Sequence, residues 1–205
     1  MGRFNLQQLL AERGLTPEER REVLEDLFVF GKKNLAPYMV RMSILLVLST
    51  IIATAGLISD SAAVVIGAML VAPLMRPVMA AAGAVVMGWP KRFYSALWLV
   101  FLMGLGALFI SSMLTLASPE LIFLPEQVLA RTRPTYYDLL IALAAGSAGA
   151  YTITRKETSA IPGVAVAVAL LPPLASAGIL VTSGEYELAT RALVLFLTNL
   201  IAMVL

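Results

Sequence analysis

Residues 59–88 read SDSAAVVIGAMLVAPLMRPVMAAAGAVVMG, an apolar stretch in which Pro73 and Pro77 flank Arg76. The stretch is long enough to cross a bilayer as a helix, and its arginine would then lie near the middle of the hydrocarbon. A proline inside a helix removes a backbone donor and disturbs the turn before it. We therefore expect a membrane helix that is broken near its centre.

A second stretch repeats this pattern about a hundred residues later. Residues 158–178 read TSAIPGVAVAVALLPPLASAG, with Pro172 and Pro173 in the middle. Backbone with unmade hydrogen bonds is tolerated at membrane depth only where it is packed in protein or lines a cavity. Paired breaks in the two halves of a membrane chain are typical of a transporter's binding site. The pattern predicts that polar main chain at both breaks lines a solute pathway.

The composition decides the broad class of protein. Of the 205 residues, 60% are hydrophobic and 14% are charged, which is more apolar surface than a soluble domain of this size can bury. The chain is therefore expected to be an all-α polytopic membrane protein whose first partner is the lipid bilayer.

The absence of histidine and cysteine limits the chemistry of the chain. Disulfides, thiolate chemistry and ordinary zinc sites are excluded, and we expect no metal and no cofactor. The segment 145–149, AGSAG, lacks the first glycine of a nucleophile elbow, and no phosphate-binding loop is present, so an enzyme is not expected. The basic residues are few and scattered, which argues against nucleic acid as a partner.

Six segments have the length and hydropathy expected of membrane spans. They are Tyr38–Ile58, Ala62–Met87, Phe93–Ala117, Asp138–Thr154, Ala160–Thr182 and Leu188–Leu205. The second and the fifth contain the proline pairs. The chain thus divides into an N-terminal region, residues 1–37, and a transmembrane domain, residues 38–205.

The N-terminal region contains a helix start at Thr16, followed by Pro17 and by Glu19 three residues after the cap. The helix is expected near residues 17–34, with an apolar stripe opposite acidic residues. Such an amphipathic helix either lies on the membrane surface, packs on the ends of the spans or docks a partner protein.

Basic residues set the expected orientation, because positively charged loops stay in the cytoplasm. With the N-terminus inside, the inner segments contain eleven basic residues, against three in the outer segments. The outer three are Arg131, Arg133 and Arg191. We therefore expect a cytoplasmic N-terminus.

The two halves align when the chain is shifted by 100 residues: Ser59 falls on Ser159, Pro73 on Pro173 and Leu74 on Leu174. Three spans in each half reverse the direction of the second half. The sequence predicts a 3+3 inverted repeat, with repeat one at residues 38–117, repeat two at 138–205, and broken second and fifth helices.

Arg76 is the leading candidate for solute binding. A guanidinium at mid-span costs about 2.5 to 3.5 kcal/mol on insertion scales, which is rarely tolerated without a partner. One interpretation is that Arg76 binds an anionic substrate, helped by free N–H groups of the half-helix near Pro77. The other is that Arg76 satisfies carbonyls freed by the prolines, or pairs with Asp60 or Asp138.

The remaining candidates surround the same breaks. The predicted substrate-binding set is Arg76, Pro73, Pro77, Pro172, Pro173 and Ser176, where Ser176 aligns with Arg76. Asp60, Asp138 and Asn199 are weaker candidates for ion binding or gating. For each of these a structural role is also open: Asp60 as a helix cap, Asp138 as part of a Thr135–Asp138 capping box, and Asn199 as a buried amide that hydrogen-bonds across helices.

Several motifs in order resemble one known family. They are SDSAAVVIGAMLVAPLMRP, RTRPTYYDLLIALAAGSAGAYTI, SAIPGVAVAVALLPPLASAGI and LFLTNLIAMVL, which together cover about Arg41 to Leu205. The chain is similar here to the domain-of-unknown-function 389 family of prokaryotic hydrophobic membrane proteins. The resemblance implies a multi-pass protein of a prokaryotic inner membrane whose biochemical activity is unassigned.

The sequence thus supports a secondary transporter or channel for a small solute, with an anion favoured by Arg76, and with the site at the mid-membrane breaks. The alternative is a membrane scaffold or signalling protein that docks partners through its N-terminal helix and has no transport activity. Six short spans enclose little volume, so we also expect a homo-oligomer.

Overall fold

The computed structural model describes residues 35–118, 124–154 and 161–205, all of them helical or in short connections. The helix expected near residues 17–34 lies outside the described residues. The helices are α3 (Leu35–Ile58), α4 (Ala62–Val71), α5 (Met75–Val86), α6 (Pro90–Leu116), α7 (Glu126–Ala130), α8 (Tyr136–Thr154), α9 (Ile161–Thr182) and α10 (Tyr186–Val204). Within these ranges no strand occurs, and the predicted all-α class is confirmed.

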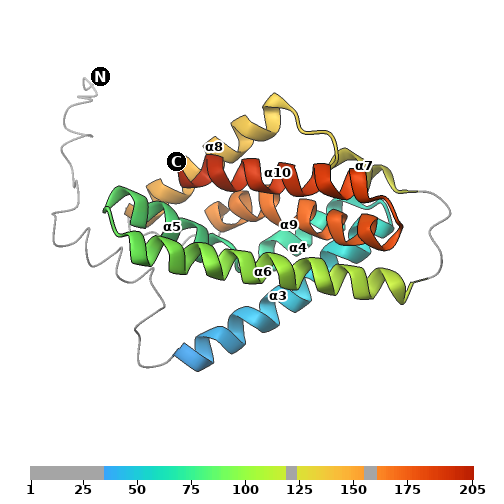
Figure 1. Ribbon diagram of the computed structural model, residues 1–205, viewed down its shortest axis with the longest axis horizontal. Helices are drawn as coiled ribbons and strands as arrows, with labels where there is room; N and C mark the ends of the chain where they lie inside the picture. Colours follow the sequence, from blue (N-terminus) through green and yellow to red (C-terminus); the bar gives the residue numbers. More distant parts are fainter. Residues whose placement is uncertain (1–34, 119–123, 155–160) are drawn as a thin grey trace, which may run out of the picture.

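Helix α9 forms the centre of the molecule (Figure 1). From Val166 to Leu180 every side chain is buried except the half-buried Val168, and α9 contacts each of the other seven described helices. A helix that is apolar all round must be covered on all sides. The sequence of α9 therefore accounts for its central position.

The outer helices present apolar side chains away from α9. Those exposed on α3, α6 and α10 include Val40, Ile44, Leu48, Trp98, Phe101, Leu105, Phe109, Val194, Leu197 and Ile201. Within the described residues, α3, α6 and α10 are each long and apolar enough to cross a membrane, and α4 with α5 makes a fourth if the bent pair is one span. This supports a membrane protein but does not confirm the expected six spans.

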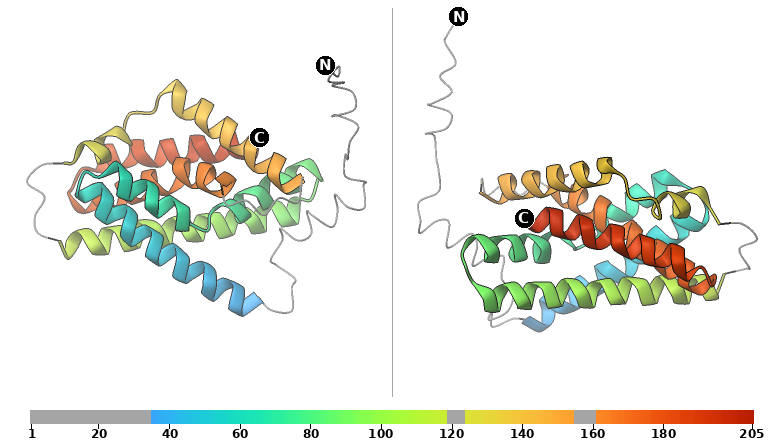
Figure 2. Two further views of the ribbon diagram at one scale, coloured as in Figure 1. Left: turned by 180° about the vertical axis from the view of Figure 1, so that it is seen from behind. Right: turned by 45° about the horizontal axis from the view of Figure 1, so that its top comes forward.

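The connections gather at two ends of the helix bundle. The α3–α4 turn, α7 and the α9–α10 turn lie together at one end, whereas the α5–α6 turn and the C-terminus lie at the other (Figures 1 and 2). A hydrogen bond from the backbone N–H of Gln127 in α7 to Asp60 Oδ1 in the α3–α4 turn, 2.8 Å long, ties two of these connections together. Successive long helices thus run in alternating directions.

The break predicted at Pro73 is present. Helices α4 and α5 are separated by residues 72–74 and meet at a bend of 62°. Ala72 has an extended backbone, φ −64° and ψ 125°, as expected for a residue before proline. Pro77 lies in the first turn of α5, where the backbone N–H groups have no helical acceptor in any case, so it does not interrupt that helix.

The break predicted in the fifth span is wrong. Helix α9 continues from Ile161 to Thr182 with Pro172 and Pro173 in its interior. Because Pro173 has no N–H, the carbonyl of Ala169 loses its usual helical donor. The Nδ2 of Asn199 in α10 donates to that carbonyl instead, at 2.9 Å. A neighbouring helix therefore replaces the missing bond, and α9 stays continuous.

Candidate functional site

Arg76 lies in the first turn of α5, immediately after the break, and its side chain is exposed. Its guanidinium interacts electrostatically with the hydroxyl of Tyr38 in α3, which is also influenced by Arg41. The Tyr38 hydroxyl is buried, and Arg76 is the charged residue that acts on it most strongly. No described acidic residue forms an ion pair with Arg76, so the pairing with Asp60 or Asp138 that we considered is not seen in this part of the chain.

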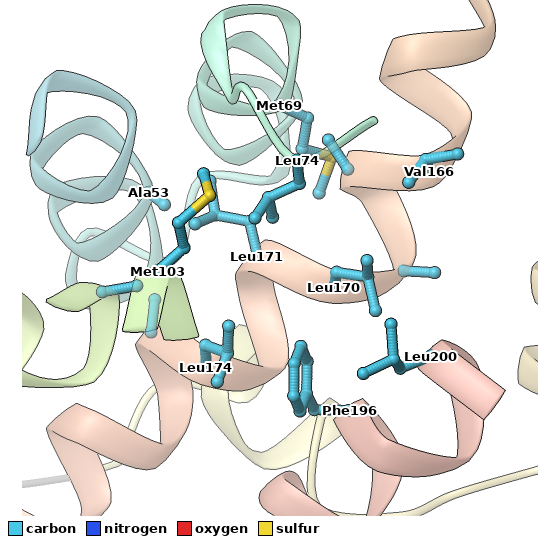
Figure 3. Packing of buried hydrophobic residues seen from close by; sticks show 14 of the residues in the cluster. Ala53, Met69, Leu74, Met103, Val166, Leu170, Leu171, Leu174, Phe196 and Leu200 are labelled. Carbon is cyan, nitrogen blue, oxygen red and sulfur yellow. The ribbon is translucent and has the colours of Figure 1, made fainter. Parts of the chain in front are cut away.

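The two proline-containing segments meet through apolar side chains rather than across a polar hollow. Leu74, from the break, and Leu171, from α9, lie in one buried cluster with Met69 and Met103 (Figure 3). Leu74 is 1% exposed and Leu171 is completely buried. On this face of α9, the expectation that polar main chain at both proline sites lines a shared pathway is therefore wrong.

The proposed partner positions Arg76 and Ser176 do not share an environment. Ser176 is completely buried in α9, and its Oγ has no hydrogen-bond partner among the described residues, whereas Arg76 is exposed. Pro172 and Pro173 are buried in the same helix, and Pro73 is half-buried at the break. The predicted substrate-binding set is thus divided between the α4–α5 break, where Arg76 is exposed and Pro77 is buried, and a buried group in α9.

A small cavity with a few polar groups in its lining lies on another face of α9. Its volume is about 30 Å³, and it is lined by Arg131, Asp138, Ile141, Val168, Ala169, Pro173, Leu195 and Asn199. The cavity brings together three residues that the sequence singled out separately: Pro173, Asp138 and Asn199. They come from three different helices, which is why their proximity has no sign in the linear sequence.

Asp138 is held in place by the predicted capping box at the start of α8. Its Oδ2 accepts hydrogen bonds from the backbone N–H and from the Oγ1 of Thr135, at 2.8 and 2.7 Å. The Asp138 carboxylate also faces Arg131. Burial lowers the pKa of Arg131 from its ordinary value, and the charge of Asp138 partly offsets this effect.

Asp60 is a helix cap, but of a helix distant in the sequence. The N-cap of α4 is Ser61, which makes no side-chain cap bond. Asp60 has a positive φ of 53° and accepts the N–H of Gln127 at the start of α7. Its carboxylate is thereby used to satisfy a free helical N–H group, and Asp60 joins the α3–α4 turn to α7.

The hydroxyl contacts between α6 and α9 could not be predicted from the sequence. Ser111 Oγ donates to the Ala175 carbonyl at 2.7 Å, and Ser112 Oγ donates to the Gly178 carbonyl at 3.1 Å. Serines are common in apolar helices, where they usually bond within their own helix. Ser111 and Ser112 differ from such serines only because α6 packs closely against α9.

Comparison with known proteins places the chain among relatives without an assigned activity. It is 31% identical over 188 residues to an uncharacterized protein of Methanocaldococcus jannaschii, a match that covers 92% of this chain and 56% of the relative. The chain thus spans little more than half the length of that relative. No solved structure matches it. Residues 69–205 match the family model described as "Domain of unknown function (DUF389)", and the chain belongs to this family.

Proposed function

We propose that this protein is a membrane transporter or channel for a small solute, and that Arg76 at the α4–α5 break binds an anionic group of that solute. The observation that carries the proposal is the placement of an exposed guanidinium in the first turn of α5, directly after a 62° bend. The first turn of a helix has free N–H groups and a partial positive charge. Arginine and helix terminus together favour an anion at this point.

The helix contacts support the proposal of a 3+3 inverted repeat. The helices can be matched in pairs: α3 with α8, the α4–α5 pair with α9, and α6 with α10. When the members of each pair are exchanged, any two helices in contact are replaced by two helices that are also in contact. For example, α6 packs on α9, and α10 packs on α5. Inverted repeats of this kind are common in secondary transporters, whose sites lie between the two halves.

The test is anion flux into proteoliposomes that contain the purified full chain. The panel includes chloride, phosphate and small carboxylates, each measured against protein-free vesicles. Arg76→Ala should reduce flux by about ten-fold or more, equivalent to about 1.4 kcal/mol, because the solute loses its charged partner. Arg76→Lys should retain part of the flux, since it keeps the positive charge.

Arg191→Ala is the matched control, because Arg191 is exposed on α10, where it pairs with Glu187 at 2.7 Å. It should leave flux unchanged, and all variants must match the wild type in elution and melting temperature. Equal flux in Arg76→Ala and the wild type would remove Arg76 from the mechanism. If no solute in the panel is transported and a partner protein binds through residues 16–34, the scaffold alternative replaces transport.

A further inference from the structure

The cavity beside Pro173 contains both a buried donor and a buried acceptor without partners. Asn199 is 3% exposed, and while its Nδ2 donates to Ala169, its Oδ1 has no hydrogen-bond partner among the described residues. The Nε of Arg131 is also buried, and it has no hydrogen-bond partner among the residues that the structure describes. Both side chains line the cavity. A buried polar atom left unpaired costs about 1 to 3 kcal/mol, so a ligand that satisfies both atoms is strongly favoured.

A second acceptor comes from the proline pair. Val168 lines the cavity, and its carbonyl cannot receive the usual helical bond because residue 172 is proline. Helical geometry places residues 169 and 173 on one face of α9, with 168 beside them. The cavity therefore adjoins the segment of α9 whose backbone bonds the two prolines remove.

The mixed charges around the cavity disfavour a bound ion of either sign. A cation would lie against the Arg131 guanidinium, and an anion would lie against Asp138 and the Asn199 carbonyl oxygen. A ligand must instead accept one hydrogen bond and donate others. The cavity volume of about 30 Å³ exceeds the roughly 10 to 15 Å³ that one buried water requires, and such a water needs two to four polar partners.

We propose that this cavity binds one water molecule, which accepts a hydrogen bond from Arg131 Nε and donates to Asn199 Oδ1 and to the Val168 carbonyl. The water joins the connection before α8 to α9 and α10 and completes the backbone bonding of the proline pair. This site is independent of Arg76 and of the proposed transport, because none of its lining residues belongs to α4 or α5.

The experiment is X-ray radiolytic footprinting of the full chain in nanodiscs, read by mass spectrometry. Ionisation of a bound water produces hydroxyl radicals that oxidise its neighbours even when bulk solvent cannot reach them. Leu195 and Leu174 are matched probes: they are 2% and 3% exposed, but only Leu195 lines the cavity. We expect Leu195 to be oxidised several-fold more than Leu174, and ¹⁸O from labelled bulk water to enter Leu195 later than it enters Tyr186, which is exposed beside the α9–α10 turn.

Equal, low oxidation of Leu195 and Leu174 would overturn the proposal. So would immediate ¹⁸O entry at Leu195, because it would indicate open solvent rather than a bound molecule. Replacing sodium and chloride by choline and gluconate should change nothing, and a dependence on either ion would show that an ion occupies the cavity. Asn199→Leu should lower the oxidation of Leu195, whereas Thr198→Val, at an exposed position of α10, should not. Should Asn199→Leu fail to fold, the wild-type measurement alone decides.

Discussion

At the scale of single residues, one glycine sets how closely the central helix approaches α6. A Cβ added at Gly178 would lie 2.7 Å from the carbonyl oxygen of Leu108 and 2.7 Å from the Cβ of Ser111. Neither atom is at the end of a flexible side chain. The hydroxyl bonds from Ser111 and Ser112 to the backbone of α9 also depend on this short separation.

Gly178→Ala should therefore destabilise the protein, by about 1 to 3 kcal/mol, because the helices must separate to admit a methyl group. Gly67→Ala is the matched control, since a Cβ at Gly67 in α4 meets nothing within 4 Å. The control should be neutral or stabilising by up to about 1 kcal/mol, as expected for alanine in a helix interior. Denaturant unfolding followed by circular dichroism measures both. A Gly178→Ala protein as stable as Gly67→Ala would contradict the close approach.

Asp60 has a left-handed backbone conformation and also caps α7. Substitutions can separate the contributions of these two features to stability. Asp60→Ala should cost about 1 to 2 kcal/mol through loss of the cap, with a further cost from the positive φ. Asp60→Asn should retain most of the stability, because asparagine tolerates this conformation and its oxygen accepts the same bond.

Hydrogen exchange of the Gln127 amide is the specific readout for Asp60. Exchange should accelerate in Asp60→Ala and stay near the wild-type rate in Asp60→Asn. Equal acceleration in both variants would indicate that the negative charge of Asp60, rather than its cap geometry, holds α7.

At the scale of elements, the contrast between the two proline sites depends on their neighbours. The α4–α5 pair separates at Pro73, whereas α9 continues through two consecutive prolines. The difference is that Asn199 reaches the Ala169 carbonyl that Pro173 leaves without a donor. Asn199 therefore links α10 to α9 through this hydrogen bond. The suggestion that Asn199 also takes part in ion binding stays a prediction.

A double-mutant cycle tests this bond. Asn199→Leu should destabilise the wild type by about 1 to 3 kcal/mol, because the Ala169 carbonyl is left buried without a donor. In a Pro173→Ala background the residue 173 N–H can bond to that carbonyl, so the same Asn199→Leu change should cost clearly less. Thermal or denaturant unfolding of the four proteins gives the coupling. Additive costs would mean that Asn199 does not compensate for Pro173.

At the scale of the whole molecule, apolar outer faces and alternating helices suit a bilayer. The α3–α4 and α9–α10 turns lie at one end and the α5–α6 turn at the other. The predicted orientation assigns the first end to the outside and the second, with Lys91 and Arg92, to the cytoplasm.

The absence of cysteine makes this orientation testable without background labelling. Single cysteines at Lys91 and at Ser183, both exposed, should react with an impermeant thiol reagent from opposite sides of the membrane. Arg133→Cys should label from the same side as Ser183→Cys. In intact cells the reagent should label only Ser183→Cys and Arg133→Cys, and in inverted vesicles it should label only Lys91→Cys. Labelling of Lys91→Cys and Ser183→Cys from one side would refute the alternating arrangement.

Much of the helical layout could be predicted because it depends on local pattern. The bounds of α3, α6, α9 and α10 lie within three residues of the predicted spans, since apolar runs and turn residues are short-range features. The Thr135–Asp138 capping box and the break at Pro73 were predictable for the same reason. The surroundings of Arg76 were not, because Tyr38 lies in a different helix.

The sequence by itself determined that the chain is helical, where its long helices begin and end, and that Pro73 interrupts one of them, because proline geometry and hydropathy act over a few residues. Only the tertiary structure decided that α9 continues through Pro172 and Pro173 and that Asp60 caps α7. The hydrogen bonds responsible join residues 30 and 67 positions apart. Such partners are selected by packing around α9, and no local pattern encodes which side chain will reach which freed backbone group.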